Sequence, residues 1–227
     1  MEKNNDGDTV LHKIFRHTNL PSSFDLILKE SLQANIGGEF GLGGLFHTAR
    51  EDIQSKIIDR WEEFLPDLQT VITELEQMQT EPPILHAAIL ANAPLHIITS
   101  IIENFHFSIL KQDSLNRLPI QVAVLVDLEW NSGMREIIEA TAARQHQPSI
   151  YVAARYGLKW NNGMSEVAKS NANEVLDGID DITGLRLFML AAAGDVGGWS
   201  IDLSSVYGMM RMSPNQCYTC INVCSTN

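Results

Sequence analysis

Residues 120–140 read IQVAVLVDLEWNSGMREIIEA, and residues 150–170 read IYVAARYGLKWNNGMSEVAKS. Nine of the 21 aligned positions are identical at a spacing of 30 residues. Within them, Trp130-Asn131-x-Gly133-Met134 recurs as Trp160-Asn161-x-Gly163-Met164. Self-similarity at a fixed period is the sequence signature of repeat architectures. The sequence therefore predicts a repeated structural unit in this part of the chain.

Each copy is predicted to form two short helices joined by a turn. A stretch of small apolar residues around Val122 and Ala123 comes first, and Trp-Asn-x-Gly then interrupts it. Met134, Ile137 and Ile138 follow at helical spacing. Helices this short are marginal in water on their own. We therefore expect successive pairs to stack and bury their apolar faces against one another.

Weaker copies of the same pattern lie on both sides. Residues 83–102 predict a small-residue helix, a turn at residues 92–94, and a second helix with an inward apolar face. That face is formed by Ile97, Ile98, Ile101 and Ile102. Residues 187–212 repeat the pattern. The repetition therefore extends over most of the chain.

These residues resemble the ankyrin-repeat family. The resemblance rests on Thr9-Val10-Leu11-His12, on Leu85-His86-Ala87-Ala88, on residues 113–120 (DSLNRLPI) and on residues 181–184 (DITG). It implies an all-α, ankyrin-type helix-turn-helix repeat solenoid with short, partly degenerate β-hairpin loops. The candidate units are residues 4–38, 39–77, 78–112, 113–142, 143–180 and 181–213, followed by a cysteine-containing tail at 214–227. Residues 39–77 fit the pattern least well.

Several local features refine this interpretation. In the first unit, a helix from Phe24 to Leu32 is expected after a Ser22 or Ser23 cap. Residues 50–79 predict longer helices broken at Pro66. In the fourth unit, Asn116 replaces the usual glycine because asparagine tolerates a positive φ. The segment ARQHQP, residues 143–148, predicts a shortened or missing hairpin.

The resemblance also explains residues that otherwise suggest chemistry. His12, His47 and His86 occupy its Leu-His position, where the imidazole binds backbone at a turn, and Asp181 is expected to cap a hairpin. Because Trp130 and Trp160 recur in the inter-helix turn, they are interpreted as packing residues. The glycine-rich run at residues 37–44 lacks the lysine of a phosphate loop and is interpreted as a flexible connection.

Charge and composition exclude several classes of partner. The chain has 28 acidic and 16 basic residues, a formal net charge of −12. It has no cluster of lysine and arginine, so nucleic-acid binding is not expected. Its apolar runs are too short to span a bilayer, and its start has no apolar signal region. We therefore expect a cytoplasmic or nuclear protein without a membrane partner, and the charge favours a partner with a basic surface.

The sequence predicts a non-enzymatic scaffold or adaptor that binds another protein through the concave face of the array, without a cofactor or metal. The resemblance places partner contacts after the alanines of the first helices and at the hairpin tips. These positions are Arg16, His17, Leu90, Leu125, Arg155, Tyr156, Ser114, Leu115, Arg117, Ile182 and Arg186. Because Arg and Tyr are common hot-spot residues, Arg117, Arg155, Tyr156 and Arg186 are the preferred candidates. Arg16 and Ser114 are included with them as candidate contact residues.

Two alternatives remain open. Cys217, Cys220 and Cys224 have a spacing that can bind zinc or an iron–sulfur cluster, which allows an α-helical metalloprotein. The repeats also begin without a polar capping unit, although terminal repeats of such arrays need their outer faces covered. The chain could then be a fragment of a larger multidomain protein whose activity lies elsewhere.

Overall fold

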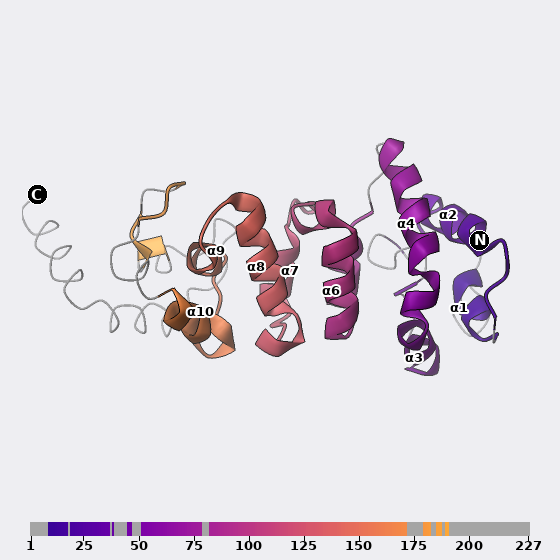
Figure 1. Ribbon diagram of the computed structural model, residues 1–227, viewed down its shortest axis with the longest axis horizontal. Coiled ribbons are helices and arrows are strands. Elements are labelled where there is room, and N and C mark those ends of the chain that lie inside the picture. The colour runs from indigo at the N-terminus through magenta and orange to yellow at the C-terminus, as the bar shows by residue number, and fades with distance from the viewer. Residues whose placement is uncertain are drawn as a thin grey trace, which may run out of the picture. The chain divides into compact units, whose positions relative to one another are not determined.

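The computed structural model describes residues 9–17, 19–36, 38, 45–46, 51–78, 82–171, 179–182, 185–187 and 189–190. This part of the chain is mostly helical, and its only β-type pairing is an isolated antiparallel bridge between Ile179 and Arg186. The chain divides into two compact units, Met1–Val126 and Asp127–Asn227. Figure 1 shows the helices of both units. The prediction of an all-α protein is confirmed.

Unit 1 contains helices that pack in pairs. They are α1 (Val10–Phe15), α2 (Phe24–Gln33), α3 (Glu51–Asp59), α4 (Trp61–Gln77), α5 (Ile84–Leu90), α6 (Leu95–Asn104), the short η2 turn (His106–Ile109) and α7 (Pro119–Leu125). Helix α2 packs on α4, and α5 packs on both α6 and α7. Two side-chain bonds join α4 to α6: Trp61 Nε1 donates to Ser100 Oγ (2.9 Å), and Gln69 Nε2 donates to Asn104 Oδ1 (2.7 Å).

An aromatic cluster forms the core between α1, α2 and α4. Phe15, Phe24, Phe64 and Trp61 are almost completely buried. Their rings meet edge to face, with centroids 5.2–5.9 Å apart. Such pairs add about 0.5–1.5 kcal/mol each beyond the area they bury. The cluster therefore joins α1, α2 and α4 into one core.

Two local predictions in unit 1 are wrong. The helix at residues 50–79 is interrupted at Arg60, whereas α4 continues through Pro66. The apolar face of α4, from Trp61 to Leu75, is buried on both sides of the proline, and this burial outweighs the single hydrogen bond that Pro66 cannot donate. Helix α2 begins at Phe24 as expected, but the Ser23 side chain makes no capping bond, since its backbone is not extended.

The helix pair at residues 83–102 agrees with its prediction. Helix α5 ends at Leu90, Asn92 adopts a left-handed conformation (φ +50°), and α6 follows Pro94. Ile97, Ile98 and Ile101 are buried, and Ile102 is half-buried. A proline before the first helical residue fixes the chain at the helix start. The apolar spacing and the proline together therefore determine this pair.

Unit 2 contains the turn-and-helix elements of the repeated sequence. They are η3 (Trp130–Ser132), α8 (Met134–Gln145), α9 (Ser149–Arg155), η4 (Trp160–Met164) and α10 (Ser165–Ser170). Helix α9 packs on both α8 and α10 (Figure 1). Only His146, Gln147 and Pro148 separate α8 from α9, and His146 is left-handed (φ +53°). The predicted loss of a hairpin at this link is confirmed.

Candidate protein-binding surface

The candidate surface in unit 1 begins with two equivalent helices. Helix α5 (ILHAAIL) and helix α7 (PIQVAVL) are 35 residues apart in the sequence and pack directly against each other. Ala88 and Ala123 at matching positions are fully buried. Small side chains at this point let helices approach closely. The corresponding helices of two successive repeats therefore lie next to each other in the structure.

Each of these helices ends on an exposed leucine. Leu90 is 40% exposed and Leu125 is 44% exposed, and Val126 after α7 is exposed as well. The two leucines occupy corresponding positions, one at the C-terminal end of each helix. A single exposed leucine is ordinary on a protein surface. A recurrence at the same repeat position is better explained by a contact surface.

The loop before α7 is a tight turn built around Asp113. The buried Asp113 carboxylate accepts backbone hydrogen bonds from Leu115 (2.9 Å) and Arg117 (2.8 Å), and Arg117 Nε donates to it as well (2.8 Å). Burial favours the neutral acid, but the bonds from Arg117 and Leu115 outweigh it and lower the pKa of Asp113. Asn116 is left-handed (φ +58°), as predicted. Leu115 is thereby presented at the tip, 65% exposed.

Histidines attach the helices to turns, as the resemblance implies. His86 Nε2 donates to the carbonyl of Arg117 (2.9 Å), which connects α5 to the following loop. At the start of the chain, Thr9 N donates to His12 Nδ1 (3.2 Å), and His12 N donates to Thr9 Oγ1 (3.4 Å). Both buried imidazoles therefore organise backbone. His47 lies outside the described residues.

The turn around Asp180 in unit 2 buries a different aspartate from the one predicted. Asp180, not Asp181, is the buried acid of this segment, and its backbone N donates to the carbonyl of Leu185 (2.9 Å). Asp181 is exposed. From the sequence alone, either of the two neighbouring aspartates could take the buried position. In the structure Asp180 is the one that pairs with Arg155, so Asp180 is buried. Ile182 at this turn is 64% exposed.

Arg155 is held inside unit 2. Its side chain is only 9% exposed, and Nη2 donates to Asp180 Oδ1 (2.5 Å). The same guanidinium donates to Gln145 Oε1 (3.1 Å) and Gln147 Oε1 (2.6 Å). A buried arginine with this set of acceptors fixes α9 to the segment containing Asp180. Its role in the fold makes Arg155 a poor contact residue.

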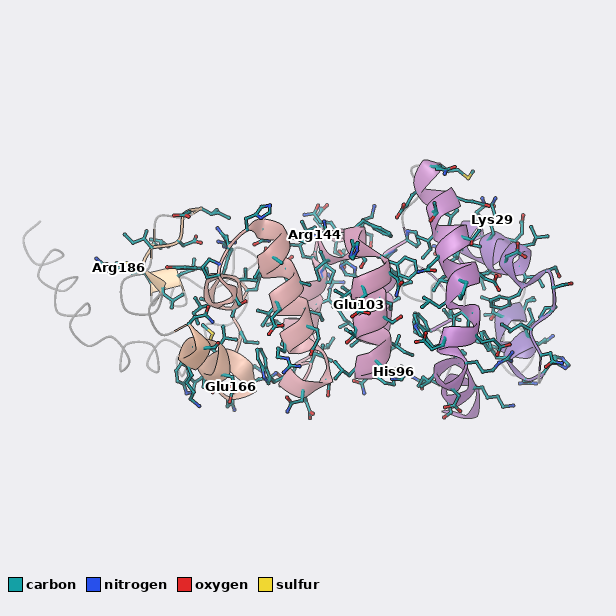
Figure 2. All side chains as sticks on the ribbon, viewed as in Figure 1. Lys29, His96, Glu103, Arg144, Glu166 and Arg186 are labelled. Atoms are coloured by element: carbon teal, nitrogen blue, oxygen red, sulfur yellow. The ribbon has the colours of Figure 1, made fainter. Side chains whose placement is uncertain are left out.

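The other expected contact residues lie in different settings. Ser114 and Arg117 share the turn before α7, where the exposed Ser114 lies near the tip and Arg117 pairs with Asp113 (2.7 Å). Tyr156 is half-buried and its hydroxyl accepts from Gln145 Nε2 (3.3 Å). Arg186 lies at the bridge with Ile179 (Figure 2), and Arg16 is exposed at the end of α1.

The repeated Trp-Asn-x-Gly turns contact each other in unit 2. The Trp130 ring lies against Gly163, where a methyl group in place of hydrogen would meet ring carbon Cε3 at 2.0 Å. Trp130 N donates to Asn162 Oδ1 (3.0 Å), and Asn162 Nδ2 donates to the carbonyl of Leu128 (2.9 Å). The expectation that Trp130 is a packing residue is confirmed. The glycine it packs against was not predicted, although the 30-residue recurrence identified both positions.

Comparison with known proteins adds no family. No family model matches the chain. No significant match is found among curated proteins or among solved structures either. In the described part of the chain, no group of three or more His, Cys, Asp and Glu side chains is placed to hold a metal ion. The candidate cysteine ligands lie outside that part. Among the described residues, no helix is long and apolar enough to cross a membrane.

Proposed function

We propose that this chain is a divergent ankyrin-type repeat protein that binds another protein and has no enzymatic activity of its own. The contact surface is formed by the ends of the first helices and by the loop tips. The observation that carries the proposal is the repeated exposure of leucine at the end of α5 and α7, with Leu115 at the loop before α7. We interpret this recurrence as an interaction surface, because exposed apolar patches often mark one.

The turn chemistry supports the ankyrin-type assignment. Asp113, the left-handed Asn116 and the His86 bond to Arg117 together reproduce what the resemblance implies for one hairpin and its neighbouring helix. A helix pair of another kind would not require these polar groups at these positions. Stacking of short helix pairs in unit 1 is the second support.

The structure changes which residues we expect to contact the partner. Arg155 is buried and Arg117 is engaged with Asp113, so their charges serve the fold. Leu90, Leu125 and Leu115 are the better candidates. Arg16 and Ser114 are exposed and remain polar candidates. A leucine surface on a chain of net charge −12 suits a partner whose apolar residues are flanked by lysine or arginine.

The experiment is affinity capture with the tagged full chain and two variants. The first variant carries Leu90→Ser, Leu115→Ser and Leu125→Ser. The matched control carries Leu26→Ser and Met78→Ser, which change two other exposed apolar side chains of unit 1, each 59% exposed. We expect at least one captured protein to bind the first variant about tenfold more weakly and to bind the control normally. Retention of every captured protein by the triple variant counts against the proposal.

A further inference from the structure

Trp130 in unit 2 lies between two hollows of the surface. The first hollow has a volume of about 450 Å³ and is lined by Asp127, Glu129, Trp130, Asn131, Lys159, Asn161 and Asn162. The second has a volume of about 300 Å³ and lies between α8 and α10; its lining includes Trp130, Glu139 and Glu166. Figure 2 shows Glu166 projecting from α10. Trp130 therefore forms part of the wall of both hollows.

The position of this indole is fixed before any ligand binds. Its ring rests on Gly163, and its backbone N–H is held by the side chain of Asn162. Asn162 is in turn fixed by the carbonyl of Leu128 and lies 3.3 Å from the Asp127 carboxylate. The tryptophan is nevertheless only partly buried, so some of its surface remains accessible. A pre-positioned aromatic surface binds a ligand without the entropy cost of ordering it.

The charges around Trp130 favour a cation. Each hollow carries two carboxylates: Asp127 and Glu129 in the first, Glu139 and Glu166 in the second. Each also contains one basic residue. Lys159 pairs with Asp127 (2.9 Å), and Arg135 pairs with Glu136 (2.8 Å) outside the lining. The balance is therefore negative on both sides of the ring, which repels a phosphate or a carboxylate.

We propose that these two hollows bind lysine or arginine side chains from a flexible basic segment of a partner protein. A guanidinium or ammonium group over an indole is attracted by the ring's quadrupole, and the flanking carboxylates add ion pairs. The amide side chains of Asn131 and Asn161 supply both donors and acceptors for the segment's backbone. The net charge of −12 increases the rate at which such a segment meets the surface.

This site is separate from the leucine surface of unit 1 and uses different chemistry. The test is fluorescence anisotropy of the full chain with a fluorescein-labelled peptide, GSKRGKRSG, at 50 mM NaCl. The acidic peptide GSEEGEESG is the probe control. Glu129→Gln and Glu139→Gln each remove one carboxylate from one hollow. Glu62→Gln and Glu103→Gln remove an exposed carboxylate from unit 1 and serve as matched charge controls.

We expect Glu129→Gln and Glu139→Gln each to weaken binding of the basic peptide about three- to five-fold, and the two control variants to change it by less than about 1.5-fold. Trp130→Leu, which keeps an apolar side chain against Gly163, is expected to weaken it about five-fold. Equal effects from hollow and control variants would show that binding follows net charge alone and would overturn the proposal. So would no binding of the basic peptide, or equal binding of the acidic one.

Discussion

The contact between Trp130 and Gly163 predicts a large and specific cost for adding one methyl group. Gly163 has φ +104°, and a Cβ there would lie 2.0, 2.6 and 2.8 Å from three ring carbons of Trp130. A backbone of this kind costs a side-chain-bearing residue about 1–3 kcal/mol. Displacing a packed ring adds about 1–3 kcal/mol. We therefore expect Gly163→Ala to lower the free energy of unfolding by about 2–6 kcal/mol.

The chain contains its own control for this prediction. Gly157 also has a positive φ (+73°), but a Cβ there would meet nothing within 4 Å. Gly157→Ala should therefore show the backbone cost alone, about 1–2 kcal/mol. The difference between the two variants therefore reports mainly the collision with the ring. Urea unfolding followed by circular dichroism at 222 nm gives both values.

A double-mutant cycle with Trp130→Ala separates the two costs further. Removing the ring relieves the collision but leaves the backbone strain at residue 163. We expect Gly163→Ala to cost about 1–3 kcal/mol less in the Trp130→Ala background than in the native chain. If Gly163→Ala is no more destabilising than Gly157→Ala, or if the cycle shows no coupling, the repeated turns do not interlock in the way described.

Three further predictions concern buried or crowded charges. Arg155→Met should destabilise unit 2 by about 3–5 kcal/mol because it leaves Asp180 buried without its cation, and a simultaneous Asp180→Leu should recover part of that loss in the same urea assay. The fold lowers the pKa of Asp113, so its carboxylate stabilises the protein above its ordinary pKa of 3.8 and loses this effect as the pH falls through the folded pKa. Asp113→Asn should therefore lower the free energy of unfolding at pH 7 by about 1–3 kcal/mol. It should also make the loss of stability below pH 4 less steep than in the native chain. The charged carboxylate of Asp67 destabilises the fold, since burial and the nearby Asp25 raise its pKa. Asp67→Asn should therefore raise the thermal midpoint at pH 7. This gain should disappear below about pH 4, where the native carboxyl is protonated.

The sequence predicted correctly those elements that are determined by residues close to one another in the chain. Pro94 and the isoleucine spacing determine the second helix of one pair, and Asn116 has the left-handed backbone expected of an asparagine that replaces glycine. The absence of a hairpin before α9 could also be predicted from the sequence, because residues 143–148 contain no turn long enough to form one. In each case the deciding groups lie within a few residues of one another.

The predictions that failed depend on partners distant in the sequence. Pro66 breaks a helix by local rules, yet the buried face of α4 holds the helix through it. The choice between Asp180 and Asp181 depends on Arg155, 25 residues earlier. That same pairing buries an arginine that the resemblance and its residue type assigned to a contact surface. Only three-dimensional packing supplies this information.

The central claim is that α5, α7 and the intervening loop form the surface that meets a partner protein. It is tested most directly by placing a photo-crosslinking amino acid singly at Leu90, Leu115, Leu125 or Leu26 and irradiating the chain with its captured partner. All four side chains are exposed, so each substitution leaves the core intact. We predict crosslinks to one partner from positions 90, 115 and 125 and none from position 26. Crosslinks from position 26, with none from the other three, would contradict the claim.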